Sequence, residues 1–256
     1  MKSPQRGVQS VEMAGQILRV IVDQARPLSL KEIADLVETP PSQVYTYLVS
    51  LTRVGLLKRN DFTQAFEPGQ LSFRLGVSAL YRLPKVSEAI PIVNEIGRRL
   101  EVNVFVAVWS RHGPIVVHYA EHGAVLSIGF RFGTVLSLTR TATGRLFSAY
   151  HPVELSEAVI RNQTFTRDNL EMFRSKAFKE DLIEIRKKGT SVAQGYPTPS
   201  VSTISVPVLD QDGRILLAMT AFSGAASFDN ARIVGVADDL RRACERLLSE
   251  SLESDV

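Results

Sequence analysis

Small polar side chains gather on one side of the segment 41–53, with types and spacing that suit recognition of DNA. At about 100° per residue, Ser42, Thr46 and Arg53 fall on one face of a helix that begins at Pro41. Hydroxyl and amide groups near a helix N-terminus reach base edges in the major groove. Between residues 39 and 60 every charged side chain is cationic, so no carboxylate would repel a phosphate. The residues expected to contact DNA are Ser42, Gln43, Tyr45, Thr46, Arg53, Lys58 and Arg59.

A second group of hydroxyl-bearing residues lies in the segment from Gly133 to Gly144, which runs directly into an expected helix start. The free backbone N–H groups of a helix N-terminus are a natural site for a carboxylate or another anion. The alternative is a tight loop whose hydroxyl groups bond only within the protein. Residues of the late strands, and three aromatic residues, could complete a cavity around such an anion. The candidate ligand contacts are Thr139, Thr141, Ala142, Thr203, Ser205 and Ser223, and the candidate walls are Trp109, Phe130 and Phe132.

Catalytic and metal-binding patterns are missing from the sequence. It contains neither a G-x-S-x-G elbow nor a G-x-x-x-x-G-K-[ST] loop. His118 and His122 share a face of a strand, but their Cα atoms would lie about 13 Å apart, too far for one ion. Cys244, the only cysteine, has no basic partner and is expected to be a packed thiol. We therefore expect no catalytic residue, no metal and no cofactor.

The elements that would position the first group form a winged helix-turn-helix. Ser29 and Glu32 have the spacing of a capping box, and the apolar residues that follow recur at helical intervals. Prolines at positions 40 and 41 end that helix and open the next, which Gly55 closes. A strand over 56–59 and a hairpin loop over 61–69 complete the motif, while residues 11–21 supply an earlier helix. The alternative is a three-helix packing module with a solvated polar face.

Composition sets the compartment and the number of domains. The chain has 256 residues, 45% of them apolar, which is enough for two cores. A net charge of +3 is too small to indicate nucleic acid binding by itself. One cysteine, no apolar run long enough to span a bilayer and no signal region indicate a cytoplasmic protein without membrane contact.

The second half of the chain alternates between helix and strand patterns, which indicates an α+β sensor-like domain. Glycine-containing turns and an Asp210–Gly213 hairpin turn separate valine-rich segments. The expected strands are 102–110, 114–120, Val125 to Phe130, 201–209 and 214–222. The expected helices are 71–83, which ends before Pro84, then 86–100, 141–150, 153–162, one long helix over Arg167 to Lys188 that Gly189 ends, and 230–250.

These motifs, in this order, resemble the IclR family of bacterial transcriptional regulators over nearly the whole length. In the first half the resemblance rests on Ser10-Val11-Glu12, the segment 30–34, the helix 41–51 and Gly55-Leu56; in the second it rests on Gly133 with Leu138, the segment 141–145, Val206-Pro207-Val208 and the strand 218–224. The resemblance implies an N-terminal winged helix-turn-helix (1–69), a linker helix (70–84) and a C-terminal mixed α/β, GAF-like domain for effector binding and oligomerisation (85–256). It also implies an effector cavity that includes Thr141, Ala142, Thr203 and Ser223.

The sequence departs from the family pattern at several positions. Thr46 stands where the family often has an arginine in the recognition helix, which implies a different operator sequence. Ser137-Leu138-Thr139 replaces a common proline-leucine-histidine motif, and Thr203 matches a cysteine that helps bind effector in some members. Ala193-Gln194 replaces an acidic pair, so the cavity should accept an anion more readily.

The sequence thus predicts a ligand-responsive transcriptional regulator rather than an enzyme. Its expected partners are double-stranded operator DNA, a small carboxylate or aromatic acid, and further copies of itself in a homodimer or a dimer of dimers. One winged helix reads only a few base pairs, and the apolar stripe of the linker helix suggests the dimer contact. The alternatives are an enzyme with an appended helix-turn-helix and a sensor module whose winged helix does not bind DNA.

Overall fold

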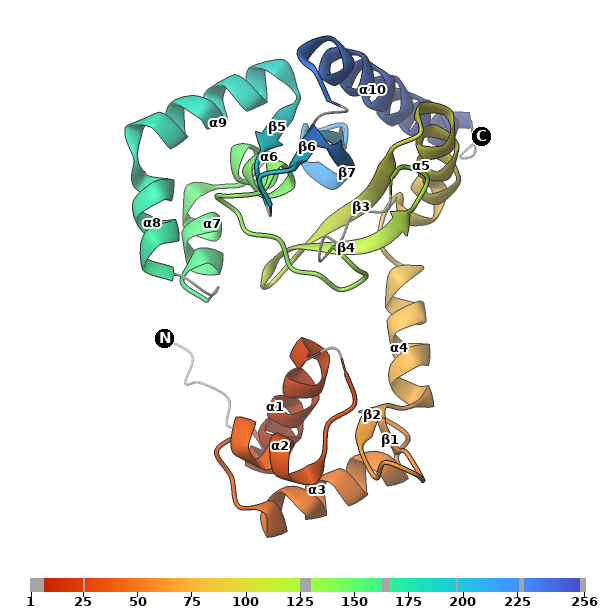
Figure 1. Ribbon diagram of the computed structural model, residues 1–256, viewed down its shortest axis with the longest axis vertical. Helices are drawn as coiled ribbons and strands as arrows, with labels where there is room; N and C mark the ends of the chain where they lie inside the picture. The colour runs from red at the N-terminus through yellow and green to blue at the C-terminus, as the bar shows by residue number, and fades with distance from the viewer. Residues whose placement is uncertain are drawn as a thin grey trace. The chain divides into compact units, whose positions relative to one another are not determined.

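The computed structural model describes residues 7–24, 26–124, 130–162, 166–196, 198–225 and 228–253 (Figure 1). It divides into two units, Met1–Arg82 and Leu83–Val256, and each is described by itself. The first contains α1 (Gln9–Gln24), α2 (Leu30–Leu36), α3 (Pro41–Arg53), β1 (Leu57–Arg59), β2 (Phe66–Pro68) and α4 (Gln70–Leu80).

The first unit is the winged helix-turn-helix that the sequence predicts. The Ser29 Oγ accepts the Glu32 N–H (3.3 Å), and the Glu32 Oε2 accepts the Ser29 N–H (2.8 Å), which completes the capping box that starts α2. The hydrogen bonds of Ser29, then the Arg26 guanidinium, lower the pKa of the Glu32 carboxyl to about 2. Buried apolar residues of α1, α2, α3 and both strands, together with Leu28, form one core: Ile17, Ile21, Leu28, Ile33, Ala34, Val44, Leu48, Leu51, Leu57 and Phe66.

The loop of the wing is shorter than predicted. The segment 61–69, expected to be a loop, contains β2, which pairs antiparallel with β1 and places Lys58 opposite Glu67. Leu28 adds a backbone bridge to Phe66 from the other side (Leu28 N to Phe66 O, 3.0 Å). Because Phe66 is a buried core residue, its burial fixes β2 where turn propensity alone predicts a loop.

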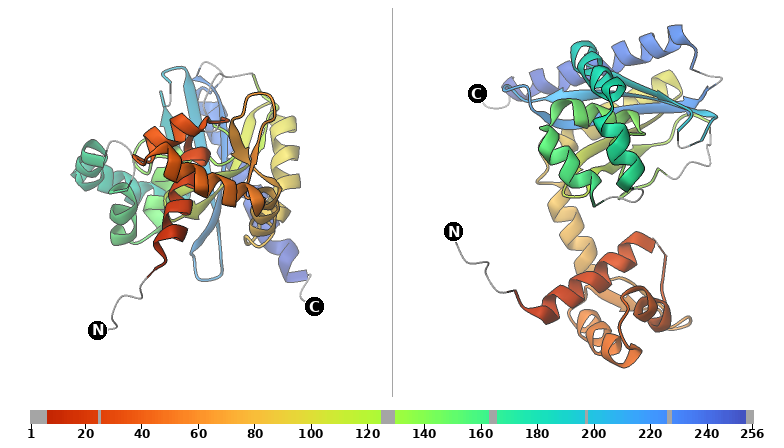
Figure 2. Two further views of the ribbon diagram at one scale, coloured as in Figure 1. Left: turned by 90° about the horizontal axis from the view of Figure 1, so that it is seen from below. Right: turned by 90° about the vertical axis from the view of Figure 1, so that its left-hand side faces the viewer.

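The second unit is built on a five-stranded antiparallel sheet in the order β4-β3-β7-β6-β5. Its strands are β3 (Asn103–Ser110), β4 (Gly113–Ala120), β5 (Ser191–Gln194), β6 (Val201–Leu209) and β7 (Ile215–Gly224), and its helices are α5 (Val86–Leu100), α6 (Ala142–Tyr150), α7 (Val153–Ile160), α8 (Thr166–Arg174), α9 (Lys176–Lys188) and α10 (Asn230–Glu253). Figure 2 (right) shows the blue α10 on one side of the strands and the green α6 and α7 on the other. We call these two sides the α10 face and the α6 face.

The β6–β7 turn and the end of α9 follow the sequence prediction closely. The Asp210 Oδ1 accepts the N–H groups of Asp212 (2.9 Å) and Arg214 (2.8 Å), and Gly213 takes a positive φ of 74°. Gly189, at φ 62°, ends α9 and donates its N–H to the Ile185 carbonyl (2.8 Å).

In this unit one prediction is wrong and one strand was not predicted. The long helix expected over Arg167 to Lys188 is two helices, because Ser175 is extended (ψ 149°) and its Oγ caps α9 by accepting the Phe178 N–H (3.2 Å). The break lets the Phe173 and Phe178 rings pack at 5.5 Å, in a core shared with Val159 and Ile160 of α7. In addition, strand β5 was not predicted, because its four residues follow the end of α9 almost directly. Of the strand expected over Val125 to Phe130, residues 125–129 lie outside the described residues.

A loop pairs with the first half of β4 along its outer edge. Gly133 donates to the Val116 carbonyl (2.8 Å), Val116 donates to the Thr134 carbonyl (3.0 Å), and Leu136 donates to the Pro114 carbonyl (2.8 Å). The same loop packs against α6 so closely that a Cβ added to Gly144 would lie 2.7 Å from the Leu138 Cα. The segment 133–144 is therefore fixed between β4 and α6 by backbone hydrogen bonds on one side and close packing on the other.

Candidate DNA-reading surface and effector cavity

Helix α3 presents the predicted polar face to solvent. Pro41 occupies its first turn, and Val44, Leu48 and Leu51 are buried in the core of the unit. Tyr47 and Thr52 are half-buried beside these residues, and the other positions of the helix face solvent. The residues predicted to contact DNA are all exposed: Ser42, Gln43, Tyr45, Thr46, Arg53, Lys58 and Arg59.

The three cations of this surface differ in their partners. Within the described residues Arg53 makes no ion pair, so its guanidinium is available to a phosphate. The Lys58 Nζ lies 3.1 Å from the Glu67 Oε1, and a phosphate would compete with that carboxylate. The Arg59 guanidinium is held on the wing, where its Nε donates to the Gln64 carbonyl (3.3 Å) and its centre lies 5.6 Å from the Phe66 ring centroid.

The tip of the wing carries a residue that the sequence analysis did not single out. The Asn60 Oδ1 accepts the N–H groups of Phe62 and Thr63, both at 3.0 Å, and so fixes the turn. The Phe62 side chain is 97% exposed. An aromatic residue within a polar turn is the signal that could have found it.

In the second unit, the loop residues predicted to bind an effector are buried, and both of their hydroxyl groups are hydrogen-bonded within the protein. Thr141 caps α6: its Oγ1 accepts the Gly144 N–H (2.9 Å) and donates to the Ser137 carbonyl (2.8 Å). The Thr139 Oγ1 donates to the Asn169 Oδ1 (3.0 Å) and so ties the loop to α8. Ala142, the first residue of α6, is 1% exposed.

The sheet register separates the three predicted strand residues. Thr203 pairs with Phe222 and Ser205 pairs with Thr220, and Phe222 packs in the core beneath α6, so these side chains lie on the α6 face. Ser223 is the next residue after Phe222 and therefore lies on the α10 face, opposite Ser202 of β6. The structure does not bring Ser223 to Thr203 and Ser205.

Thr220, and not Ser223, lies beside Ser205 on the α6 face of the sheet. Its Oγ1 lies 2.8 Å from the Ser205 Oγ and 2.8 Å from the Thr143 Oγ1, which links β7, β6 and α6 through three buried hydroxyl groups. The Thr203 Oγ1 donates to the Ala193 carbonyl (3.3 Å). Counting alternate residues back from Phe222 would have selected Thr220, because every second residue of a strand shares a face.

A cavity of about 150 Å³ lies beneath the loop. It is lined by Phe130, Thr134, Val135, Leu136, Ser137, Thr141 and Tyr196. Of the predicted contacts only Thr141 lines it, and of the predicted walls only Phe130. Trp109 packs instead on Phe147 and His151, with ring centroids 5.8 and 4.3 Å away, and Phe132 is 64% exposed. An apolar cavity of about this volume holds one benzene-sized ring.

The lining of this cavity combines apolar side chains with hydroxyl groups and contains no charged residue. The nearest arginine of α6, Arg145, is tied by its Nε to the Asp181 Oδ2 (2.9 Å) and by its Nη1 to the Val192 carbonyl (3.3 Å). Hydroxyl groups and the N-terminus of α6 therefore supply the polar contacts. Tyr196, which follows β5, is a lining residue that the sequence analysis missed because β5 itself was missed.

The described residues contain no group of three His, Cys, Asp or Glu side chains placed to hold a metal ion. The His118 Nε2 lies 3.3 Å from the Asn94 Nδ2, and partial burial lowers the pKa of His118. Burial raises the pKa of the Cys244 thiol to about 12, so this thiol is packed in α10 and is not a reactive nucleophile. Over the part of the chain that the structure describes, no helix is long and apolar enough to cross a membrane.

Comparison with known proteins covers both units. Residues 10–61 match the family profile described as the IclR helix-turn-helix domain, and residues 77–249 match the profile described as the C-terminal domain of the bacterial transcriptional regulator IclR. The HTH-type transcriptional regulator BhcR of Paracoccus denitrificans is 24% identical over 94% of this chain and 86% of its own. The HTH-type transcriptional regulator XynR of Escherichia coli is 23% identical over 92% of this chain and 94% of its own.

Solved structures share the fold. An IclR homologue from Microbacterium hydrocarbonoxydans, complexed with 4-hydroxybenzoate, superposes with a TM-score of 0.78 at 18% identity over 93% of this chain and 97% of its own. An IclR transcriptional regulator from Alicyclobacillus acidocaldarius gives a TM-score of 0.77 at 20% identity over 94% and 98%.

Proposed function

The chain belongs to the IclR family of bacterial transcriptional regulators, and from this premise we propose that it reads operator DNA with the outer face of α3 under control of a small acid bound beneath the 133–144 loop. As a transcriptional regulator it is not an enzyme, and the relatives that it matches are named as regulators too. Its operator would lie on the chromosome, so we place it in the cytoplasm.

The observation that carries the DNA half of the proposal is the exposed, carboxylate-free face of α3. Ser42, Gln43 and Thr46 offer hydroxyl and amide groups there, and the Thr46 Oγ1 keeps its lone pairs because it donates to the Gln43 carbonyl (2.7 Å). Tyr45 is 44% exposed at the flank. Base contacts would come from these residues and phosphate contacts from Arg53, Lys58 and Arg59.

The DNA test uses a fluorescent duplex from upstream of the protein's own gene. Gln43→Ala should relax sequence preference, with a cost of about 1–3 kcal/mol at the base that Gln43 reads. Glu38→Gln, in the turn before α3, is a control that changes no proposed base contact. Equal affinity of wild type and Gln43→Ala for operator and scrambled DNA would favour a sensor module whose winged helix does not bind DNA.

The effector half rests on the cavity beside the N-cap of α6. Its volume of about 150 Å³ suits one aromatic ring or a small branched acid. Thr141 and the first turn of α6 would receive the carboxylate, while Phe130 and Leu136 would contact the ring. The homologue complexed with 4-hydroxybenzoate supports this class of ligand for a domain of the same fold.

A thermal-shift screen of small carboxylates that includes 4-hydroxybenzoate tests the effector. A ligand at 100 times its Kd should add about 2.7 kcal/mol to stability. Val135→Phe fills the cavity from a side chain that is 43% exposed, and should remove the shift while leaving DNA binding without ligand intact. Val153→Phe, 53% exposed at the start of α7, is the matched control. A Val135→Phe protein that still shifts normally would refute this cavity.

The assembly proposed for this function is a homodimer, or a dimer of dimers, that places two winged helices on one operator. Helix α4 has no buried residue, and Phe73 (70%), Leu75 (55%) and Tyr81 (75%) are exposed on it or just after it. A second copy would cover these apolar side chains. Light scattering should give a dimer or tetramer at micromolar concentration, and Phe73→Glu should lower that mass. A wild-type monomer, with or without DNA, would contradict the dimer.

A further inference from the structure

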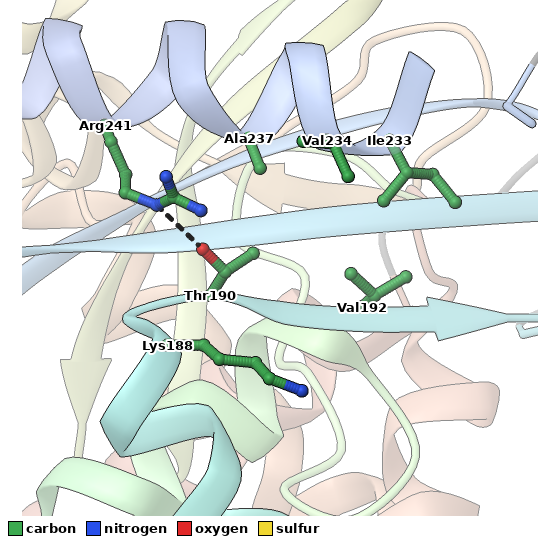
Figure 3. A pocket seen from close by; sticks show the side chains of 7 residues that line it. All are labelled: Lys188, Thr190, Val192, Ile233, Val234, Ala237 and Arg241. Atoms are coloured by element: carbon green, nitrogen blue, oxygen red, sulfur yellow. Dashed lines mark hydrogen bonds between the residues drawn. The ribbon is translucent and has the colours of Figure 1, made fainter. Parts of the chain in front are cut away.

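The second unit contains another cavity, larger than the one beneath the loop. A pocket of about 370 Å³ lies between the end of α9, the edge strand β5 and the first half of α10. It is lined by Lys188, Thr190, Val192, Ile233, Val234, Ala237 and Arg241 (Figure 3). Thr190 and Val192 turn toward α10, whereas Ser191 and Ala193 are buried on the α6 side of the same strand. This pocket is therefore separate from the loop cavity.

One side of the pocket is an apolar wall. Figure 3 shows Ile233, Val234 and Ala237 projecting from α10 toward Val192 on β5. Val234 is 59% exposed, so its isopropyl group remains in contact with water. An apolar ligand would remove that surface from water, which favours binding.

Two cations border this wall. The Arg241 Nε donates to the Thr190 Oγ1 (3.2 Å), and its Nη1 contacts Asp238, which holds the guanidinium in place and leaves Nη2 without a hydrogen bond among the described residues. The Lys188 Nζ lies 3.4 Å from the Glu184 Oε2, and both side chains are more than half exposed, so this pair is weak and the ammonium can turn toward a ligand. Neither carboxylate lines the pocket.

From this combination we propose that the pocket is a second ligand site, for a carboxylate that carries an aromatic or branched apolar body. The carboxylate would accept hydrogen bonds from the Nη2 of Arg241 and pair with Lys188, because a guanidinium fixed in orientation suits a planar carboxylate. The apolar body would lie against Ile233, Val234 and Val192. The volume is at the lower end of the range for small-molecule sites.

The test is a titration of the full-length protein with 3-phenylpropionate, followed by the methyl NMR signals of Ile233 and Val234. Wild type should show saturable shifts at these two residues. The uncharged 3-phenylpropanamide and the short acetate ion should each bind at least tenfold more weakly, since one lacks the charge and the other lacks the apolar body.

Variants of the lining residues separate the contributions of charge and shape to ligand binding. Arg241→Gln and Lys188→Gln should each weaken 3-phenylpropionate binding, the former at least tenfold. The matched neighbours Arg242→Gln and Lys187→Gln, outside the pocket, should bind as wild type does. Because Arg241→Gln also removes the bond to Thr190, Val234→Glu provides a second variant: it adds a carboxylate at an exposed position and should abolish binding of the anion.

Four results would overturn the proposal. They are equal binding of the amide and the acid, unchanged affinity in both Arg241→Gln and Val234→Glu, shifts confined to Val135 of the loop cavity, and Ile233 signals that follow protein concentration instead of the probe. The last would mean that a second copy of the chain covers the pocket.

Discussion

The outer face of α3 and the α6 face of the sheet both carry hydroxyl groups, but these groups differ in burial and in their hydrogen-bond partners. On α3, Ser42 and Thr46 are exposed, and the Thr46 Oγ1, which donates to the Gln43 carbonyl, can still accept a hydrogen bond from another molecule. On the sheet, Ser205 and Thr220 are fully buried and bonded to each other at 2.8 Å. The same residue types therefore serve recognition in one unit and cohesion in the other.

Burial explains this difference. A buried hydroxyl group without a hydrogen bond is costly, which explains why Ser205, Thr220 and Thr143 bond to one another. The Ser191 and Ser202 hydroxyl groups of the same sheet are buried with no hydrogen bond among the described residues. A hydroxyl group on an exposed helix bonds to water, which DNA can replace. The comparison predicts that substitutions on the α6 face change stability first, and that substitutions on α3 change DNA binding first.

The largest expected effect is on the α6 face. Phe222 is fully buried, with ring centroids 5.9 Å from Phe105 and 5.4 Å from Phe130. Phe222→Ala should lower the free energy of unfolding of the second unit by about 3–5 kcal/mol, because it leaves a cavity. Denaturation followed by the fluorescence of Trp109, the only tryptophan, measures it. The exposed control, Phe132→Ala, should change stability by less than about 0.5 kcal/mol.

A smaller effect is expected from the buried hydroxyl chain. Thr220→Val keeps the shape of the side chain but leaves Thr143 and Ser205 without their shared partner. The second unit should lose about 1–3 kcal/mol of stability in the same fluorescence assay. Thr220→Ser retains the hydroxyl group and should lose less. If the valine variant were as stable as wild type, the hydroxyl chain would not contribute to cohesion.

On α3 the expected effect is on binding instead. Arg53→Ala should weaken binding to all DNA sequences and reduce the salt slope by about 1, since one phosphate contact is lost. Lys58→Ala should cost less, because Lys58 already pairs with Glu67. Fluorescence anisotropy at several salt concentrations separates the two. A larger loss for Lys58→Ala would show that DNA displaces Glu67 completely.

The smallest effect concerns the cap of α2. The folded protein holds the pKa of Glu32 at about 2, below its ordinary 4.5, so the stabilising contribution of its carboxylate is complete above pH 4.5 and is lost as the pH falls toward 2. Glu32→Ala should therefore melt below wild type at pH 7, and the two proteins should converge near pH 2. Circular dichroism melts of both proteins test this, and a difference that persists at pH 2 would contradict it.

Local signals in the sequence were sufficient for most of the first unit. Ser29, Glu32 and Pro41 act on their own neighbours, so helix ends could be predicted from spacing. In the second unit the outcome depends on distant partners. Ser175 breaks a helix because Phe173 and Phe178 share a core with α7, and Ser223 faces the α10 side because of the β6–β7 register. The loop cavity could be expected near Thr141, but its contact with Tyr196 could not.

The two edges of the sheet have a consequence for solubility. At one edge, the segment 133–136 bonds to the backbone groups of Pro114 and Val116 in β4. At the other, β5 is only four residues long, and Arg145 takes the carbonyl of Val192. Neither edge offers a long free row of N–H and C=O groups, which would be the template for strand addition and aggregation. Copies of this domain should therefore associate through side chains of their helices and loops, not by extending the sheet.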